Sequence, residues 1–124
     1  QAGPSLWPSN KGEICLTNDD NGELVSLAVM HTVGNHYIVH GRSETTDGSI
    51  TLINGNAEII GGKILIHFSG SGYNTSQDEV HGGSGWVELD ANTLMGWYRG
   101  IGSHCNLIEC GLEYEGPQLI GPCH

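Results

Sequence analysis

The sequence predicts an all-β protein: a single-domain antiparallel up-and-down barrel of about eight strands, with a two-sheet β-sandwich as the alternative. Three observations support this class. Apolar and polar residues alternate with a period of two around Gly61-Gly62, as they do in half-buried antiparallel strands. The 20 glycines of the 124-residue chain lie between apolar runs without collagen's three-residue period, so they indicate turns rather than disorder. No stretch has a convincing helical period, and the length suits one domain but not two.

The hairpin around Gly61-Gly62 is the clearest element. Two adjacent glycines can supply the positive φ angles of a tight two-residue turn. This turn pairs Ile60 with Lys63 and, continuing in register, Ala57 with Ile66. One face of the hairpin is then apolar and is predicted to join the core: Ala57, Ile59, Ile64, Ile66 and Phe68.

The remaining strands are expected wherever apolar runs lie between turn residues. In chain order, we expect strands at 13–18, 24–33, 36–43, 49–60, 63–69, 86–90, 94–101 and 111–115, the last with a candidate extension at 118–120. Asn21-Gly22 and Gly34-Asn35 are expected to form hairpin turns. A bulge or bend is expected at 54–56, and the polar, Gly-rich residues 70–85 are expected to form the longest loop.

The chain is expected to divide into an extended N-terminal arm, residues 1–12, and a barrel domain, residues 13–124. Pro4 and Pro8 keep the arm from forming a helix. The sequence begins with Gln1 rather than Met, which suggests a mature N-terminus left after removal of a signal peptide. We therefore expect a secreted, extracellular or periplasmic protein.

Charge limits the classes of partner. Only 4 residues are Lys or Arg, against 14 Asp and Glu, and the formal net charge is −10. Nucleic acids and anionic membranes both attract cationic side chains, which are scarce here. No apolar run is long enough to span a membrane. We therefore expect no nucleic-acid partner and no membrane insertion, whereas cations and neutral ligands remain open.

The four cysteines favour two disulfides. An even count in a small, exported chain is typical of a disulfide framework. Three pairings are possible, and we favour Cys105–Cys110, which closes a short loop, with Cys15–Cys123, which joins the first strand to the C-terminus. A zinc site is the alternative, because His104 precedes Cys105 and His124 follows Cys123. However, the chain contains no C-x-x-C spacing.

The aromatic residues near the end of the chain suggest a ligand-binding face. A four-residue turn at 90–93 would pair Leu89 with Leu94 and Trp86 with Trp97. The two tryptophans would then share a face with Glu88 and Arg99, forming a floor for a flat organic ligand or a sugar: Trp86, Glu88, Trp97 and Arg99. Ordinary packing is the alternative, with the tryptophan pair covering the core or plugging the barrel.

Histidine is frequent, with 7 residues. A Gly34-Asn35 turn would pair Val33 with His36 and place His31, His36 and His40 on one face. His36 and His40 lie roughly 13 Å apart along a strand, too far to share one ion. At most one pair could share a metal, His31 with His36 or His31 with His40, and a third ligand must come from another strand. Half-exposed histidines on a sheet surface are the favoured interpretation.

No motif in the sequence indicates catalysis. G-x-S-x-G, H-E-x-x-H and P-loop patterns are absent, and paired cysteines leave no thiol nucleophile. The acidic residues are scattered over turns and strand faces. The sequence therefore favours a binding protein over an enzyme and implies no cofactor.

The predicted architecture resembles the calycin group, which contains the lipocalins and avidins. Lipocalins carry a Gly-x-Trp before the first strand and an arginine on a late strand that packs over that tryptophan. Gly3 and Trp7 lie before the first predicted strand here, with a wider spacing, and Arg99 lies on the seventh. The resemblance implies that Arg99 packs over Trp7, whereas no biotin-binding motif of the avidins is present.

Three functions follow as hypotheses. The leading one is a secreted or periplasmic, non-enzymatic β-barrel that binds a small organic ligand. The second is a self-assembling extracellular subunit, in which residues 1–12 add to the sheet of another copy. The third is a histidine-based metal-binding protein.

Overall fold

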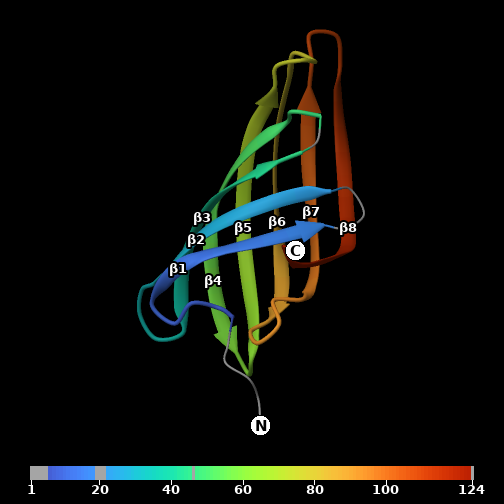
Figure 1. Ribbon diagram of the computed structural model, residues 1–124. Helices are drawn as coiled ribbons and strands as arrows, with labels where there is room; N and C mark the ends of the chain where they lie inside the picture. Colours follow the sequence, from blue (N-terminus) through green and yellow to red (C-terminus); the bar gives the residue numbers. More distant parts are fainter. Residues whose placement is uncertain (1–5, 19–21, 46, 124) are drawn as a thin grey trace.

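The computed structural model describes residues 6–18, 22–45 and 47–123. Eight antiparallel strands, each hydrogen-bonded to the next along the chain, close into one barrel (Figure 1). The strands are β1 (Lys11–Asn18), β2 (Glu23–His31), β3 (His36–Glu44), β4 (Ile50–Ile60), β5 (Lys63–Asn74), β6 (Glu79–Asp90), β7 (Gly96–Cys105) and β8 (Cys110–Pro122). The predicted up-and-down barrel is confirmed, and a single closed sheet replaces the sandwich alternative.

The β4–β5 hairpin has the predicted register. Ile60 pairs with Lys63 and Ala57 with Ile66. Both turn glycines have positive φ, 57° at Gly61 and 79° at Gly62, which residues with side chains rarely adopt. The predicted apolar face lies inside the barrel: Ala57, Ile64 and Ile66 are buried, and Ile59 and Phe68 pack against the core.

The β2–β3 hairpin differs from the prediction by one residue. The backbone N–H of Thr32 donates to the carbonyl of His36 and that of His36 to Val33, both at 3.0 Å, so the turn is one residue longer than a Gly34-Asn35 turn. Val29 therefore pairs with Val39. A one-residue slip exchanges the two faces of a strand. The strand also ends at His31 rather than at residue 33.

The predicted loop at 70–85 is wrong. β5 continues to Asn74 and β6 begins at Glu79, so only a short turn separates two long strands. The glycines here belong to strands, where they permit close backbone approach instead of a turn. A Cβ atom added at Gly72 would lie 1.8 Å from the carbonyl oxygen of Ile50.

The predicted bulge at 54–56 is also absent. Gly55 pairs with Val39 on one side and with Phe68 on the other, in uninterrupted register. A Cβ atom at Gly55 would lie 2.1 Å from the carbonyl oxygen of His67. As at Gly72, the missing side chain allows the neighbouring strand to approach.

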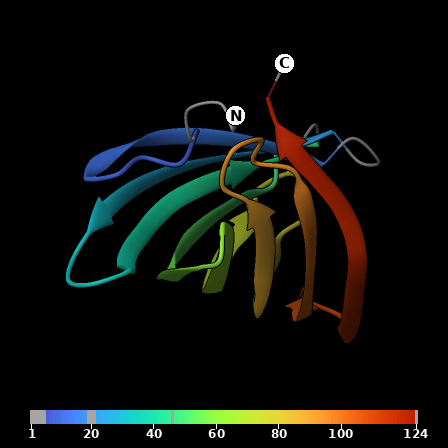
Figure 2. The same cartoon turned by 90° about the horizontal axis from the view of Figure 1, so that it is seen from below.

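Trp7 closes one end of the barrel. It is 3% exposed, within the main core cluster, and its ring meets Tyr37 edge-on at 5.6 Å between centroids. The backbone N–H of Trp7 donates to the carbonyl of Ala91 at 3.3 Å, and the Tyr37 hydroxyl donates to the carbonyl of Ser9 at 3.3 Å. The described part of the arm therefore folds onto its own barrel, and Lys11 already belongs to β1. Figure 2 views the barrel from the end where the N-terminal segment enters.

Two disulfides have the favoured pairing. Among the described residues, β1 and β8 pair at Leu16 with Pro122 and at Thr17 with Gly121, so the described closing seam is short. Cys15–Cys123 lies directly beside it, and the Cys123 N–H donates to the Cys15 carbonyl at 3.1 Å. Cys105–Cys110 joins the facing ends of β7 and β8. Bonded cysteines provide no thiolates, so the zinc alternative is wrong.

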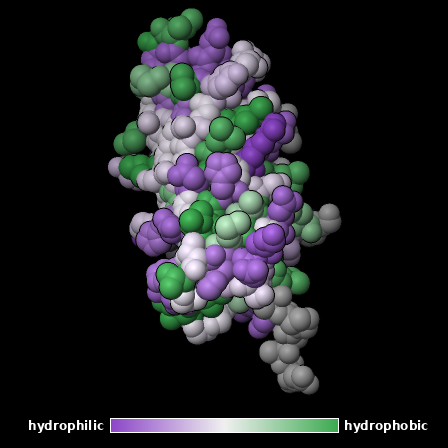
Figure 3. All heavy atoms as spheres, turned by 90° about the vertical axis from the view of Figure 1, so that its left-hand side faces the viewer, coloured by the Kyte–Doolittle hydropathy of each residue, from purple (hydrophilic) through white to green (hydrophobic). Residues whose placement is uncertain are grey.

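The outer surface is mixed in character. On the side shown in Figure 3, apolar and polar residues are interspersed in small groups. Scattered exposed apolar side chains are normal for a folded protein. Within the described residues, no helix has the length and apolar character needed to cross a membrane.

Candidate functional site

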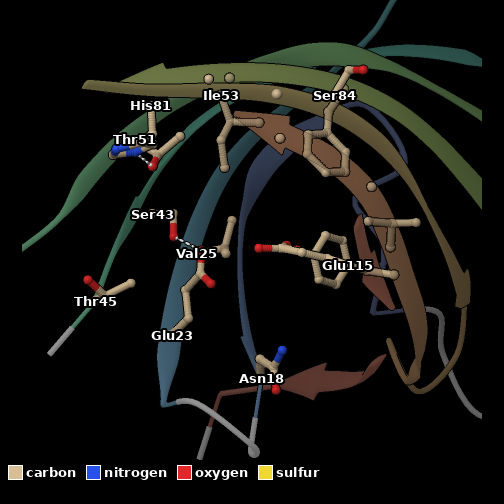
Figure 4. Close-up of a pocket in the computed structure, with 18 of the residues that line it drawn as sticks. Asn18, Glu23, Val25, Ser43, Thr45, Thr51, Ile53, His81, Ser84 and Glu115 are labelled. Atoms are coloured by element: carbon tan, nitrogen blue, oxygen red, sulfur yellow. Dashed lines mark hydrogen bonds between the residues drawn. The ribbon is translucent and has the colours of Figure 1, made fainter. Parts of the chain in front are cut away.

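A cavity of about 420 Å³ lies inside the barrel (Figure 4). Residues from all eight strands line it, and it opens away from the end that Trp7 closes. This volume falls within the range of small-molecule sites, roughly 300–1,000 Å³. The cavity is therefore the candidate site.

Inward-facing glycines create the space. Gly70 on β5 pairs with Gly83 on β6, and Gly83 pairs with Gly102 on β7. In the neighbouring row, Gly85 pairs with Gly100. Since none of these positions carries a side chain, this part of the wall formed by β5, β6 and β7 is bare backbone. Three of these glycines, Gly70, Gly83 and Gly85, lie in the segment 70–85 that was predicted to form a loop.

The part of the cavity nearer the end closed by Trp7 is apolar, and it is called the floor below. Phe68 and Tyr98 lie side by side with their ring centroids 6.2 Å apart. Aliphatic side chains from the surrounding strands complete this floor: Leu16, Val25, Leu27, Val39, Ile53, Ile66, Val87 and Ile120. Such a floor can bury the apolar body of a ligand.

Polar groups line the part of the cavity nearer its open end, and hydrogen bonds fix several of them. The Ser43 hydroxyl donates to the Glu23 carboxylate, and Ser43 is only 2% exposed. Thr51 Oγ1 and His81 Nε2 are hydrogen-bonded at 2.6 Å. These pairs appear in Figure 4, where Glu23 and Ser43 lie across the cavity from Ser84. Fixed polar groups around an apolar floor are typical of sites that orient a ligand.

The charged groups of the lining are all acidic apart from two histidines. The carboxylates come from β2, β6 and β8: Glu23, Glu79, Glu113 and Glu115. None of the described lining residues is Lys or Arg. Partial burial raises the pKa of Glu115, and the negative charge of Glu23 raises this pKa further. The mouth of the cavity therefore has a negative potential.

The predicted tryptophan face lies outside the barrel. Trp86 pairs with Arg99 and Trp97 with Glu88, so the direct pairing of the two tryptophans is wrong. The turn is two residues longer than expected: Asp90 N donates to Met95 O at 2.9 Å, and β7 begins at Gly96. A slip of two residues keeps the faces unchanged, so the four residues share one face as predicted.

These outer residues contact one another. The Arg99 guanidinium lies 4.5 Å from the centroid of the Trp86 ring, and Trp97 Nε1 donates to Glu88 Oε2 at 2.8 Å. Their inward neighbours Val87 and Tyr98 line the cavity instead. Arg99 therefore covers Trp86, not Trp7 as the lipocalin resemblance implied. Ligand binding on the outer tryptophan face stays a prediction.

The predicted metal pair is separated. His31 lies on the same side of its strand as Val29 and the core, whereas His36 lies on the exposed side of β3. His31 Nε2 donates to the Gly34 carbonyl at 2.7 Å. The shared histidine face is wrong because the longer turn exchanged the faces of β3 relative to β2. In the described ranges, no three or more His, Cys, Asp or Glu side chains are grouped to hold a metal ion.

Sequence reasoning missed the acidic and glycine residues of the cavity. One signal was present: residues 69–73 alternate glycine with Ser or Tyr, a period of two that is typical of a strand. Comparisons with protein-family models, curated proteins and solved structures found no significant match to this chain. The site therefore has to be interpreted from its own geometry.

Proposed function

We propose that this protein is a secreted or periplasmic, non-enzymatic barrel that binds a small organic ligand in its cavity. The observation that carries the proposal is the cavity of about 420 Å³, with an apolar floor and fixed polar groups near its mouth. A barrel interior filled by side chains would leave no such space.

Two further features support the proposal. Disulfides persist in oxidising compartments, which favours a secreted or periplasmic location. An eight-stranded up-and-down barrel with one closed end is also the architecture of the calycins. We include a calycin-like relation in the proposal on this architecture alone.

A cavity-filling substitution tests the proposal. A Cβ atom at Gly102 would meet only the carbonyl oxygen of Gly82, at 3.3 Å, so a side chain there requires little backbone adjustment. Gly102→Leu should fill the cavity and weaken binding of N-phenyl-1-naphthylamine, a neutral apolar probe, at least about tenfold. The measurement is the increase in probe fluorescence on titration.

Gly82→Leu is the matched control. The backbone of Gly82 borders the cavity, but a Cβ atom added there would lie 3.6 Å from the Cβ of Ser71, and strand alternation directs it to the outer face. This variant should bind the probe like the unmodified protein. If the unmodified protein binds neither this probe nor any other naphthyl compound, or if both variants bind the probe equally well, the proposed cavity function is wrong.

A further inference from the structure

The charge of the cavity wall indicates which class of small organic ligand the cavity would bind. The chain has only four cationic side chains, and all of them lie away from the lining: Lys11, Arg42, Lys63 and Arg99. Arg42 pairs with Glu44 at 3.3 Å, and Arg99 covers Trp86. No Lys or Arg side chain therefore lies among the described residues that line the cavity with these carboxylates.

Glu115 and Glu23 face each other across the cavity. Glu23 extends from β2 and Glu115 from β8, and the negative charge of Glu23 raises the pKa of Glu115. In Figure 4 the Glu115 side chain points into the cavity toward Val25 on β2. Ser43 fixes the orientation of Glu23 by donating a hydrogen bond, whereas no described residue donates one to Glu115. A cation between the two carboxylates would relieve their repulsion.

The apolar floor lies below these carboxylates. Phe68, Tyr98 and Ile53 line the same cavity as Glu23 and Glu115. A ligand that reaches both regions needs an apolar or aromatic body and a cationic group at one end. Such a cation gains charge-assisted hydrogen bonds from the carboxylates, and the aromatic rings can stabilise it further.

We propose that the cavity selects small organic cations, namely primary amines with an aromatic or apolar body, and that Glu115 and Glu23 bind the ammonium group. This inference rests on the proposed binding function. It differs from that function in assigning the cationic ligand class and the two carboxylates that recognise it.

Other titratable groups face the same space. They are Glu79 and His81 on β6, His104 on β7 and Glu113 on β8. On acidification the carboxylates lose negative charge and the histidines gain positive charge. Both changes weaken the attraction for a cation, so amine affinity should decrease as pH falls.

Three ligands with the same ring test the charge preference. We would measure 2-(1-naphthyl)ethylamine, 2-(1-naphthyl)ethanol and 1-naphthaleneacetate by isothermal titration calorimetry at pH 7. The amine should bind about tenfold or more tightly than the alcohol, because it forms hydrogen bonds with a carboxylate as a charged donor. The acetate should bind most weakly.

Substitution of single carboxylates tests whether Glu115 and Glu23 bind the ammonium group. Glu115→Gln and Glu23→Gln should each reduce amine affinity about fivefold to tenfold and leave alcohol affinity unchanged. Glu13→Gln is the control. Glu13 is exposed and lies on β1 outside the lining, and its substitution changes the net charge by the same amount. Amine affinity in the unmodified protein should also fall as the pH is lowered from 7 toward 4.5.

The outcomes separate the two proposals. If the alcohol and the neutral naphthylamine probe bind as tightly as the amine, the cation preference is wrong and the cavity function stands. If Glu13→Gln weakens amine binding as much as Glu115→Gln, net charge rather than the site explains the preference. If no naphthyl compound binds, both proposals are wrong.

Discussion

Gly83 and Glu115 show how single residues define this protein. A Cβ atom at Gly83 would lie 2.5 Å from the carbonyl oxygen of Ile101, so close strand contact requires glycine there. The same absence of a side chain leaves the cavity open. Glu115 then places a carboxylate at this space, where partial removal from water disfavours its charge. At this scale, both the hollow and its charge come from residues that do not improve core packing.

The raised pKa of Glu115 predicts a stability effect. For a carboxyl group whose pKa is raised by folding, the cost to stability is present above the folded pKa and disappears below the ordinary value of about 4.5. Glu115→Gln should therefore increase the free energy of unfolding at pH 7 by about 0.5 kcal/mol, a small value because solvent still screens this exposed side chain.

Chemical denaturation at pH 7 and near pH 3.5 checks this effect. The difference between Glu115→Gln and the unmodified protein should shrink at the lower pH, and Glu13→Gln should show no comparable change. A variant that is less stable at pH 7 would contradict the prediction and indicate that the Glu115 carboxylate stabilises the fold.

At the scale of elements, the turns decide which hairpins can be predicted. The β4–β5 register follows from two adjacent glycines, which suit a two-residue turn with positive φ at both positions. The β2–β3 and β6–β7 turns are longer, and their lengths depend on backbone hydrogen bonds such as Thr32 to His36 and Asp90 to Met95. Single sequences do not specify these bonds, so the predicted registers were wrong there.

The two disulfides should differ in their contribution to stability. Cys15–Cys123 links residues 108 positions apart beside the short β1–β8 seam, whereas Cys105–Cys110 spans only 5 positions. Loop entropy predicts a loss of about 5 kcal/mol for replacing the first pair by alanine and about 2 kcal/mol for the second.

Urea unfolding of the two double variants measures this difference. Cys105→Ala with Cys110→Ala is the control for losing a disulfide that does not close the barrel. Equal losses, or a larger loss from the short loop, would show that the seam does not depend on its disulfide.

At the scale of the whole molecule, Trp7 links the N-terminal segment to the barrel. Trp7 is buried against Tyr37, and residues 6 and 7 both donate backbone hydrogen bonds to Ala91. These contacts commit residues 6 and 7 to their own barrel. This geometry does not support strand addition by residues 6–10.

Trp7→Ala should therefore destabilise the barrel. The expected loss is about 3–5 kcal/mol, as for other large buried aromatic residues. Trp86→Ala is the control, since Trp86 is 39% exposed on the outer face and should cost about 1 kcal/mol.

The unfolding midpoint of the unmodified protein and of both variants should not change with protein concentration. Thermal unfolding at two concentrations a hundredfold apart measures this. A midpoint that rises with concentration in the unmodified protein but not in Trp7→Ala would support the self-assembling subunit instead.

The sequence by itself determined the all-β class, the β4–β5 hairpin with its core face, and the favoured cysteine pairing. These depend on local periodicity, turn chemistry and cysteine count, which a single chain displays directly. Only the tertiary structure decided that Gly70 and Gly83 line a cavity instead of forming a loop, that Gly102 lies beside them, and that Glu23 and Glu115 face each other across the cavity. Those outcomes depend on barrel closure, which brings together strands that are distant in the sequence.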